Sequence, residues 1–188
     1  MACAGSIRVM HPLFQTGEGG SNPTSALQLR FGETTRDTFK KLNRLWHSRL
    51  PEIGGSQGRA FYVAEHDGIA FAVAMWSNPV ARLLPQLTWL ELRRMAISDD
   101  APPNTASRMI AWMTRDVRKK FPEVVRLISY QDCEVHQGTI YKAAGWNRAE
   151  GYKGRIRGWS AGAGGGSTRH NRTNQSLAVR MRWEKVIV

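Results

Sequence analysis

A run of polar side chains follows an apolar, strand-like stretch in the last third of the sequence. Residues 129–146 read SYQDCEVHQGTIYKAAGW and place serine, tyrosine, aspartate, cysteine, glutamate, histidine and glutamine within nine positions. Asp132, His136 and Tyr141 are residue types that transfer protons in enzymes, and aspartate and histidine also bind metal ions. The segment therefore predicts a site of proton transfer or metal binding where a buried strand ends.

Each of these residue types also has a structural interpretation. Asp132 could cap the segment that follows it, and Tyr141 could pack in the core with its hydroxyl hydrogen-bonded. Asp132 and His136 have the spacing of two ligands on one helix, but the sequence between them reads as a loop. His47 lies near the end of a predicted helix, where a cation is a common stabilising device. The structural and functional interpretations of these residues both stay open.

Length and composition favour one domain without a membrane segment. The chain has 188 residues, of which 41% are hydrophobic, enough for a single packed core. Its longest apolar run, at 69–76, is far shorter than the ~20 residues of a membrane-spanning helix. The two cysteines, Cys3 and Cys133, are too few for a disulfide framework, and the first residues lack the pattern of a secretory signal. We therefore expect a cytoplasmic protein.

The excess positive charge is concentrated at the end of the chain. There are 27 Lys and Arg against 15 Asp and Glu, and residues 148–188 contain nine of the basic and two of the acidic residues. Aromatic side chains are interleaved with them, as in segments that bind phosphates and stack on bases. The charge could also serve solubility alone. We predict a nucleic acid as the partner, with Arg169, His170, Arg172, Arg180 and Arg182 among its contacts.

Hydrophobic periodicity predicts the elements of the first half of the chain. Residues 25–32 alternate as a strand, and a helix follows as far as Pro51. Asp67 and Gly68 separate two apolar runs and predict a tight turn between adjacent antiparallel strands. The apolar stripe of the helix is Phe39, Leu42, Leu45 and Trp46.

The second half of the chain predicts a strand, a helix and a second strand. The strands lie at 86–97 and 124–130, and a Pro-Pro-Asn-Thr sequence starts the helix between them. Such a unit is usually parallel. A short helix broken at Gly145 follows the polar segment. The apolar stripe of the longer helix is Ala106, Met109, Ile110, Met113 and Val117.

This order of elements, with a tyrosine on the short helix and a glycine-aromatic exit, resembles the acetyl-CoA-dependent N-acyltransferase (GNAT) superfamily. The resemblance implies a mixed α/β (α+β) fold whose central sheet is splayed and flanked by helices, with the acyl thioester in the gap between two parallel strands. It implies that Tyr141 protonates the departing thiolate. We expect an N-terminal arm at 1–24, a catalytic core at 25–158, and a glycine-rich and basic segment at 159–188 that completes the sheet and contacts DNA.

The predicted cofactor site departs from the usual GNAT pattern. GNAT enzymes carry several glycines in the loop around the cofactor pyrophosphate, whereas DDAPPNTASR, residues 99–108, has none. A helix N-terminus still offers free N–H groups and a positive dipole to a phosphate. The candidate cofactor-binding residues are Arg94, Asn104, Thr105, Ser107 and Arg108. For Arg94 the alternative is a solvated charge at a strand end.

A narrower resemblance rests on segments in a shared order. HSRLP, WSNPVARLL, LELRRMAI, PPNTASR, SYQD, HQGTIYKAAGW and the tail RHNRT…VRMRW look like the Mom family of phage DNA-modification proteins, over about residues 25–185. The resemblance implies conversion of the adenine N6 amino group in DNA to a carbamoylmethyl derivative, which shields phage DNA from restriction. It also implies acetyl-CoA as donor and an iron ion. The implied base or metal ligands are His47, Asp132 and His136.

The chemistry of adenine adds two expectations and leaves alternatives open. The base must leave the duplex to react, so residues must hold it outside, and Trp76, Asn78 and the RHNRT segment are candidates. Plain acetyl transfer would give an acetamide, so the carbamoylmethyl product requires a further step and a nitrogen source. An ordinary GNAT acetyltransferase acting on a protein or small amine, and a non-catalytic DNA-binding module, are the alternatives. The chain could act as a monomer or as a homodimer.

Overall fold

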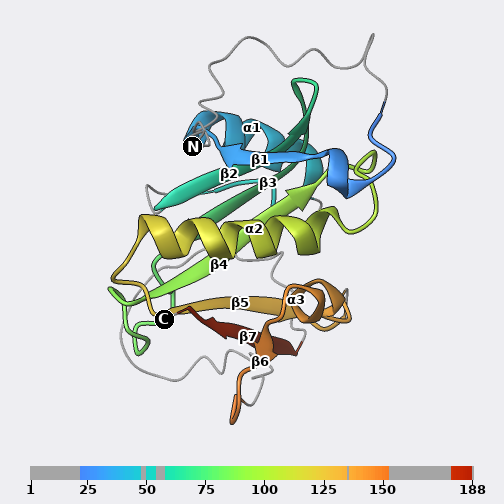
Figure 1. Cartoon of the computed structure of the whole chain (residues 1–188). Helices are drawn as coiled ribbons and strands as arrows, with labels where there is room; N and C mark the ends of the chain where they lie inside the picture. Colours follow the sequence, from blue (N-terminus) through green and yellow to red (C-terminus); the bar gives the residue numbers. More distant parts are fainter. Residues whose placement is uncertain (1–21, 48–49, 54–57, 135, 153–178, 188) are drawn as a thin grey trace, which may run out of the picture.

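The computed structural model describes residues 22–47, 50–53, 58–134, 136–152 and 179–187. They form one seven-stranded sheet in the order β1-β2-β3-β4-β5-β7-β6, with α1 on one face and α2 and α3 on the other (Figure 1). This is the mixed, helix-flanked α/β sheet that the sequence predicts. No helix in the described part of the chain is long and apolar enough to cross a bilayer.

After an initial 3-10 turn the elements follow in the order strand, helix, three strands, helix, strand, helix and two strands. The strands are β1 (Arg30–Glu33), β2 (Ala60–His66), β3 (Ile69–Ser77), β4 (Trp89–Ile97), β5 (Arg126–Asp132), β6 (Asn147–Arg148) and β7 (Arg180–Val186). The helices are the 3-10 turn η1 (Ala26–Gln28), α1 (Arg36–Trp46), α2 (Thr105–Lys120) and α3 (Thr139–Ala143).

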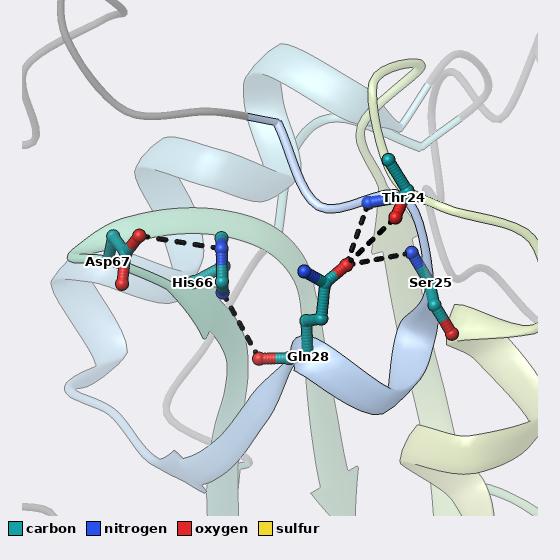
Figure 2. Close-up of polar contacts among 5 residues, drawn as sticks. All are labelled: Thr24, Ser25, Gln28, His66 and Asp67. Atoms are coloured by element: carbon teal, nitrogen blue, oxygen red, sulfur yellow. Dashed lines mark hydrogen bonds and ion pairs between the residues drawn. The ribbon is translucent and has the colours of Figure 1, made fainter.

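The strand predicted over 25–32 is wrong in its first half, because polar side chains fold that stretch into η1. The Ser25 side chain accepts a hydrogen bond from the Leu27 N–H group. The Gln28 side chain accepts from the Ser25 and Thr24 N–H groups (Figure 2). Such a capping box satisfies the backbone of a helical turn, which an extended chain would leave to other partners. The His66 ring then lies against the Gln28 carbonyl, with Nδ1 at 3.1 Å from the oxygen.

Helix α1 begins and packs largely as predicted. The Thr35 side chain accepts a hydrogen bond from the Thr38 N–H group and so caps the first turn. Phe39 and Leu42 are buried, but Leu45 is 73% exposed. Leu45 was predicted to be part of the apolar stripe. It lies about 100° around the helix from Trp46, which carries the stripe into the last turn, so Leu45 points away from the sheet.

The β2–β3 hairpin forms where Asp67 and Gly68 predict it. Both residues have positive φ angles, 49° and 80°, as the tight turn requires. Strand β3 then pairs with β4, and here the register shifts: Met75 lies opposite Arg94, and Trp76 lies opposite Leu92. One residue of β4 between these pairs therefore has no cross-strand partner, which is a β-bulge.

Two apolar clusters fill the space on either side of the sheet. The whole predicted stripe of α2 is buried against one face, and Phe39 and Leu42 of α1 pack with Val73 and Met75 on the other. Helix α2 connects β4 to β5, and these two strands are parallel, as the predicted strand-helix-strand unit requires. Because each face of the sheet has its own helix, a residue's position along β4 decides which helix its side chain meets.

Candidate active site

The two parallel strands at the centre of the sheet pair over only part of their length. Strands β4 and β5 are in register from Trp89 opposite Arg126 to Leu92 opposite Ser129, and these four pairs are the only ones between them among the described residues. Beyond that point β4 continues for five residues and β5 for three. The Ser129 hydroxyl donates to the Leu92 carbonyl oxygen at 3.1 Å, where the pairing stops.

The bulge in β4 lies at this same point and changes which way the following side chains face. Leu90 and Leu92 pack in the α2 cluster, whereas Ala96 packs in the α1 cluster. In a regular strand all three would lie on one face, because they are separated by even numbers of residues. The extra residue Arg93 therefore sends Arg94 toward α1, on the face of its cross-strand partner Met75.

Tyr141 reaches the end of the pairing from the α3 side. Its hydroxyl oxygen lies 2.9 Å from the Ser129 hydroxyl oxygen, and its ring stacks on Trp183 with centroids 5.4 Å apart. Burial raises the pKa of Tyr141, so its hydroxyl keeps the proton at neutral pH. Because the Ser129 hydroxyl already donates to the Leu92 carbonyl oxygen, the Tyr141 hydroxyl is the donor in its hydrogen bond with Ser129. The side chain belongs to the core, which confirms its structural interpretation, and it also places a proton donor where the strands diverge.

A pocket of about 200 Å³ opens between the start of α2 and helix α3. Its lining contains three of the predicted cofactor-binding residues, and its wall on the other side is α3, which carries Tyr141. The lining residues are Ile97, Pro102, Asn104, Thr105, Ala106, Ser107, Thr139, Ile140 and Ala143. Arg94 and Arg108 are not among them, so the structure does not bring the five predicted residues together.

The first turn of α2 leaves backbone donors at this pocket. Asn104 adopts a left-handed conformation, φ 68°, and makes no side-chain capping bond. The Thr105 hydroxyl donates to the Pro102 carbonyl oxygen at 2.6 Å, and the Ser107 hydroxyl donates to the Asn104 carbonyl oxygen at 3.1 Å. Both hydroxyls thus donate to carbonyls, and neither caps a backbone donor. The Thr105 N–H group donates to the Pro102 carbonyl oxygen at 3.3 Å, but among the described residues the Ala106 and Ser107 N–H groups have no backbone acceptor. These two groups and the positive end of the helix dipole remain for an anion in the pocket.

The opposite face of the diverging strands is charged and partly desolvated. The Glu91 carboxylate is buried and accepts a hydrogen bond from the Val80 N–H group at 2.9 Å. Burial raises the pKa of Glu91, while the Val80 N–H group and the nearby arginines act in the opposite direction. Burial also lowers the pKa of Arg94, whose Nη1 donates to the Arg93 carbonyl oxygen at 2.8 Å. In the described residues the buried Arg94 Nε has no hydrogen-bond partner.

His47 joins this charged face from the end of α1. Its Nδ1 accepts a hydrogen bond from the Leu50 N–H group at 3.2 Å, which requires the neutral ring with its proton on Nε2. Burial lowers the pKa of His47, and the charges of Arg94 and His136 lower it further. The interpretation of His47 as a cation stabilising a helix C-terminus is therefore wrong. The structure instead brings His47, His136 and Arg94 within electrostatic reach of one another.

Asp132 and His136 are connected through a tight turn. The Asp132 carboxylate accepts from the Glu134 N–H group at 3.1 Å, and its carbonyl oxygen accepts from the His136 N–H group at 3.0 Å. Asp132 thus caps the turn, as its structural interpretation predicts. The sequence analysis missed Gln131, whose buried side chain donates to the His136 carbonyl oxygen and accepts from Trp183 Nε1 at 2.7 Å. The available signal was its place in the polar run that directly follows Leu127 and Ile128.

The donor residues for the implied iron ion do not form a metal site in the described residues. No three His, Cys, Asp or Glu side chains there lie close enough to share an ion. His47, Asp132 and His136 therefore do not make a three-ligand set. His47 Nδ1 and the Asp132 carboxylate are already hydrogen-bonded to backbone N–H groups. These residues do not fit the iron that the resemblance implies.

The residues predicted to contact DNA have different positions. Trp76 is fully buried, with Nε1 at 3.2 Å from Met113 Sδ, so its predicted role of holding a base is wrong. Asn78 is exposed and accepts a weak hydrogen bond from Arg59 at 3.5 Å. Arg180 is exposed at the start of β7. Arg169, His170 and Arg172 lie outside the described residues.

Arg182 is held within the protein by its neighbours on the sheet. Its guanidinium carbon lies 5.1 Å from the ring centroid of Tyr152 and 5.8 Å from that of Trp89, and its Nη2 lies 3.7 Å from a Glu184 carboxylate oxygen. Most of the side chain is covered, with 16% exposed. Because Glu184 offsets its charge, Arg182 is a weaker candidate for a phosphate contact than Arg180.

Solved structures of low sequence identity share this architecture. An acetyltransferase of Bacillus subtilis in complex with CoA is 13% identical, with a TM-score of 0.53 over 86% of this chain and 99% of that one. A GNAT acetyltransferase of Streptococcus pneumoniae is 11% identical, with a TM-score of 0.55 over 85% of this chain and 99% of that one. A GNAT acetyltransferase of Elizabethkingia anophelis with acetyl-CoA bound is 10% identical, with a TM-score of 0.52 over 85% of this chain and 98% of that one. At these identities the likeness shows the GNAT fold alone.

Sequence comparison gives a narrower result. A search of curated proteins finds no significant match. The family model of the Mom protein family matches residues 65–185, a stretch that runs from the end of β2 to β7 and includes both diverging strands and both walls of the pocket. Since the match spans more than half of the sequence, this chain belongs to the Mom protein family.

Proposed function

We propose that this chain is an acetyl-CoA-dependent transferase that modifies DNA, converting the N6 amino group of adenine to a carbamoylmethyl derivative and thereby protecting phage DNA from restriction. The observation that carries the proposal is the end of β4–β5 pairing at Leu92 and Ser129, directly beside a pocket at a helix N-terminus. Membership of the Mom family supplies the substrate class.

The pocket side of the sheet is suited to the donor. The pyrophosphate of acetyl-CoA would lie at the first turn of α2, where backbone N–H groups favour an anion, and the thioester would point toward the diverging strands. Two structural neighbours hold CoA or acetyl-CoA. Tyr141 keeps its proton at neutral pH and lies at the end of the pairing, so it can protonate the thiolate that leaves.

The charged face of the sheet is suited to the acceptor. Adenine N6 is conjugated with its ring and is a poor nucleophile, so it needs a proton acceptor close by. His47 is neutral, but it accepts a proton only at Nδ1 and only after the hydrogen bond from the Leu50 N–H group breaks. Asp132 ends β5 and His136 follows it, at the same end of the gap. Plain acetyl transfer would join the carbonyl carbon to N6, whereas the carbamoylmethyl group is joined to N6 through its methylene carbon. Its formation from acetyl-CoA therefore also needs a nitrogen donor and a two-electron oxidant as further reactants.

The basic C-terminal part of the chain would hold the DNA. Residues 148–188 contain nine Lys and Arg, and each phosphate contact lowers the slope of log affinity against log salt by about 0.9. Replacing Arg169 and Arg172 with alanine should therefore weaken binding to all sequences alike and reduce the salt slope by about two. Binding that is insensitive to salt would contradict this part of the proposal.

Mass spectrometry of nucleosides tests the whole proposal. DNA from cells that express the wild-type chain should contain carbamoylmethyl-adenine, and DNA from cells with the Tyr141→Phe variant should not. Unmodified DNA together with acetyl-CoA turnover on amines would identify an ordinary acetyltransferase instead. Unmodified DNA with no acetyl-CoA turnover, but with DNA binding retained, would identify a binding module.

A further inference from the structure

Residues 78–88 form the loop that joins β3 to β4 (Figure 1). Large apolar side chains of this loop are exposed. Leu83 is 100% exposed, Leu87 76% and Val80 56%. Three large apolar side chains that are each more than half exposed within eleven residues indicate a contact with something else. The described part of the chain offers them no packing partner.

The loop is held in place from inside. The buried Glu91 carboxylate accepts from the Val80 N–H group, and the Gln86 side chain donates to the Ala81 and Leu84 carbonyl oxygens at 3.1 and 3.0 Å. The Leu84 N–H group also donates to the Ala81 carbonyl oxygen at 3.0 Å. These hydrogen bonds fix the backbone of the loop. Binding through its exposed apolar side chains therefore costs no further conformational entropy for ordering the loop.

Charge around the loop fits a polyanion. No acidic residue occurs between Asp67 and Glu91, and Arg82 lies between the exposed Val80 and Leu83. Arg59 donates to Asn78 at the base of the loop, but its charge is offset by Glu123, whose carboxylate oxygen lies 2.6 Å from its Nη2. A stable protein interface uses about 20–30 residues a side, far more than this tip offers, whereas insertion between base pairs takes one or two apolar side chains. A phosphate would contact Arg82 while the leucines contacted the stacked bases.

The loop contacts β4 one residue before the pairing with β5 ends, because the Val80 N–H group donates to the Glu91 carboxylate. It leads directly into β4, and Trp89 and Leu92 are separated by only about 10 Å of strand. Leu92 marks the end of the β4–β5 pairing. An apolar side chain inserted into the duplex from this loop would therefore enter DNA beside the base that has to reach the gap, and it would fill the space that this base leaves.

We propose, resting on the proposed function, that Leu83 and Leu87 form an apolar wedge that enters double-stranded DNA and unstacks a base step, which stabilises the extruded adenine. Glu91 is then a positioning residue, since it holds the loop through Val80. The β3–β4 loop, which lies outside the basic C-terminal segment, would thus stabilise the extruded base. Trp76 cannot do so, because it is buried in the core.

A plasmid-unwinding experiment tests the wedge without any modification chemistry. Closed circular plasmid is relaxed with topoisomerase I in the presence of the protein, and the linking number is measured after the protein is removed. Wild type should lower the linking number, because unstacked steps are untwisted. The Leu83→Ala/Leu87→Ala variant should leave it at the level of DNA alone. Its affinity in fluorescence anisotropy should stay within about tenfold of wild type, since the basic residues remain.

The chain offers a matched control. Leu27 and Leu45 are each 73% exposed and lie on η1 and α1, away from the loop. The Leu27→Ala/Leu45→Ala variant should unwind plasmid as wild type does. Both double variants should fold, because exposed substitutions change stability by about 0.5 kcal/mol or less. In addition, a mismatch opposite adenine, which already weakens pairing, should restore modification by the Leu83→Ala/Leu87→Ala variant.

Three results would overturn the wedge. Wild-type protein that binds plasmid without changing its linking number, or a Leu83→Ala/Leu87→Ala variant that unwinds like wild type, would remove the leucines from the DNA interface. A wild-type dimer that becomes a monomer in this variant, measured by light scattering, would assign them to a second copy of the chain. If wild type modifies adenine in any of these cases, the proposed function stands and the wedge alone fails. Wild type that binds no DNA overturns both.

Discussion

Strand β5 has two edges that the protein treats differently. On one side it pairs with β7 along all seven residues, from Arg126 opposite Val186 to Asp132 opposite Arg180. On the other side it pairs with β4 over only four. The same strand is regular enough to pair fully on one edge, so the divergence on the other comes from β4. A bulge strengthens local twist, and the bulge at Arg93 lies at the first residue beyond the pairing.

Side chains reinforce the difference between the edge of β5 that pairs fully with β7, the closed edge, and the edge that pairs only partly with β4, the open edge. At the closed edge, Gln131 of β5 and Trp183 of β7 share a buried hydrogen bond, and Gly138 packs directly on both. At the open edge, the Ser129 hydroxyl occupies the last Leu92 carbonyl and is itself met by Tyr141. The site is thus a gap between β4 and β5, and it depends on the complete pairing of β5 with β7.

The largest effect is expected at the closed edge, from Gly138→Ala. A Cβ atom there would lie 2.5 Å from both Gln131 Oε1 and Trp183 Cζ2, and φ is +75°. We expect a loss of roughly 3 kcal/mol or more in the free energy of unfolding, measured by urea denaturation. Gly68→Ala is the control, because its φ is +80° but nothing lies within 4 Å, so it should lose only roughly 1–2 kcal/mol. Equal losses would mean that packing at Gly138 is unimportant.

Filling the pocket beside the open edge should remove donor binding. Ala143 is exposed on α3 and lines the pocket, so Ala143→Trp places a large ring where the cofactor would lie. We expect calorimetry with acetyl-CoA to show affinity reduced by at least about tenfold, that is ~1.4 kcal/mol. Lys142→Trp adds the same ring to the same helix outside the pocket and should bind normally. Normal binding by Ala143→Trp would place the cofactor elsewhere.

A smaller change in stability is expected where the two edges meet. Tyr141→Phe removes the hydroxyl that meets Ser129 and keeps the ring on Trp183. Thermal unfolding should show a loss of about 1 kcal/mol, the usual net value of one hydrogen bond, while modification of DNA is abolished. A variant with normal activity per folded molecule would leave Tyr141 with a packing role only.

The smallest effect concerns the pH dependence of stability on the α1 face of the gap. The pKa of His47 lies below 6.5 in the folded protein, so the unfolded chain takes up a proton first as the pH falls. His47 therefore contributes stability above pH 6.5 that is lost as the pH falls through its folded pKa. His47→Asn should lose less stability than wild type between pH 7 and 5. By NMR, His136→Asn should raise the pKa of His47, since it removes one of the charges that lower it.

Features that depend on neighbours in the sequence were predictable. The turn at Asp67 and Gly68, the buried stripe of α2 and the parallel β4–β5 unit follow from positive φ preferences, a 3.6-residue period and the order of elements. Asn104 and Ser107 also line the predicted pocket, because a helix start is encoded locally. Even the error at 25–32 was local in origin, since a capping box competed there with an alternating apolar pattern.

Features that depend on which face a side chain meets were decided only by the tertiary structure. Arg94 lies with His47 and not at the pocket, because one bulged residue reverses every later position of β4, and no local signal marks the bulge. Trp76 is buried because α2, joined to the sheet further along the chain, supplies Met113 opposite its ring. The sequence by itself determined the elements and the family. The packing of distant elements decided which of its polar residues share a site, because that requires contacts between residues far apart in the chain.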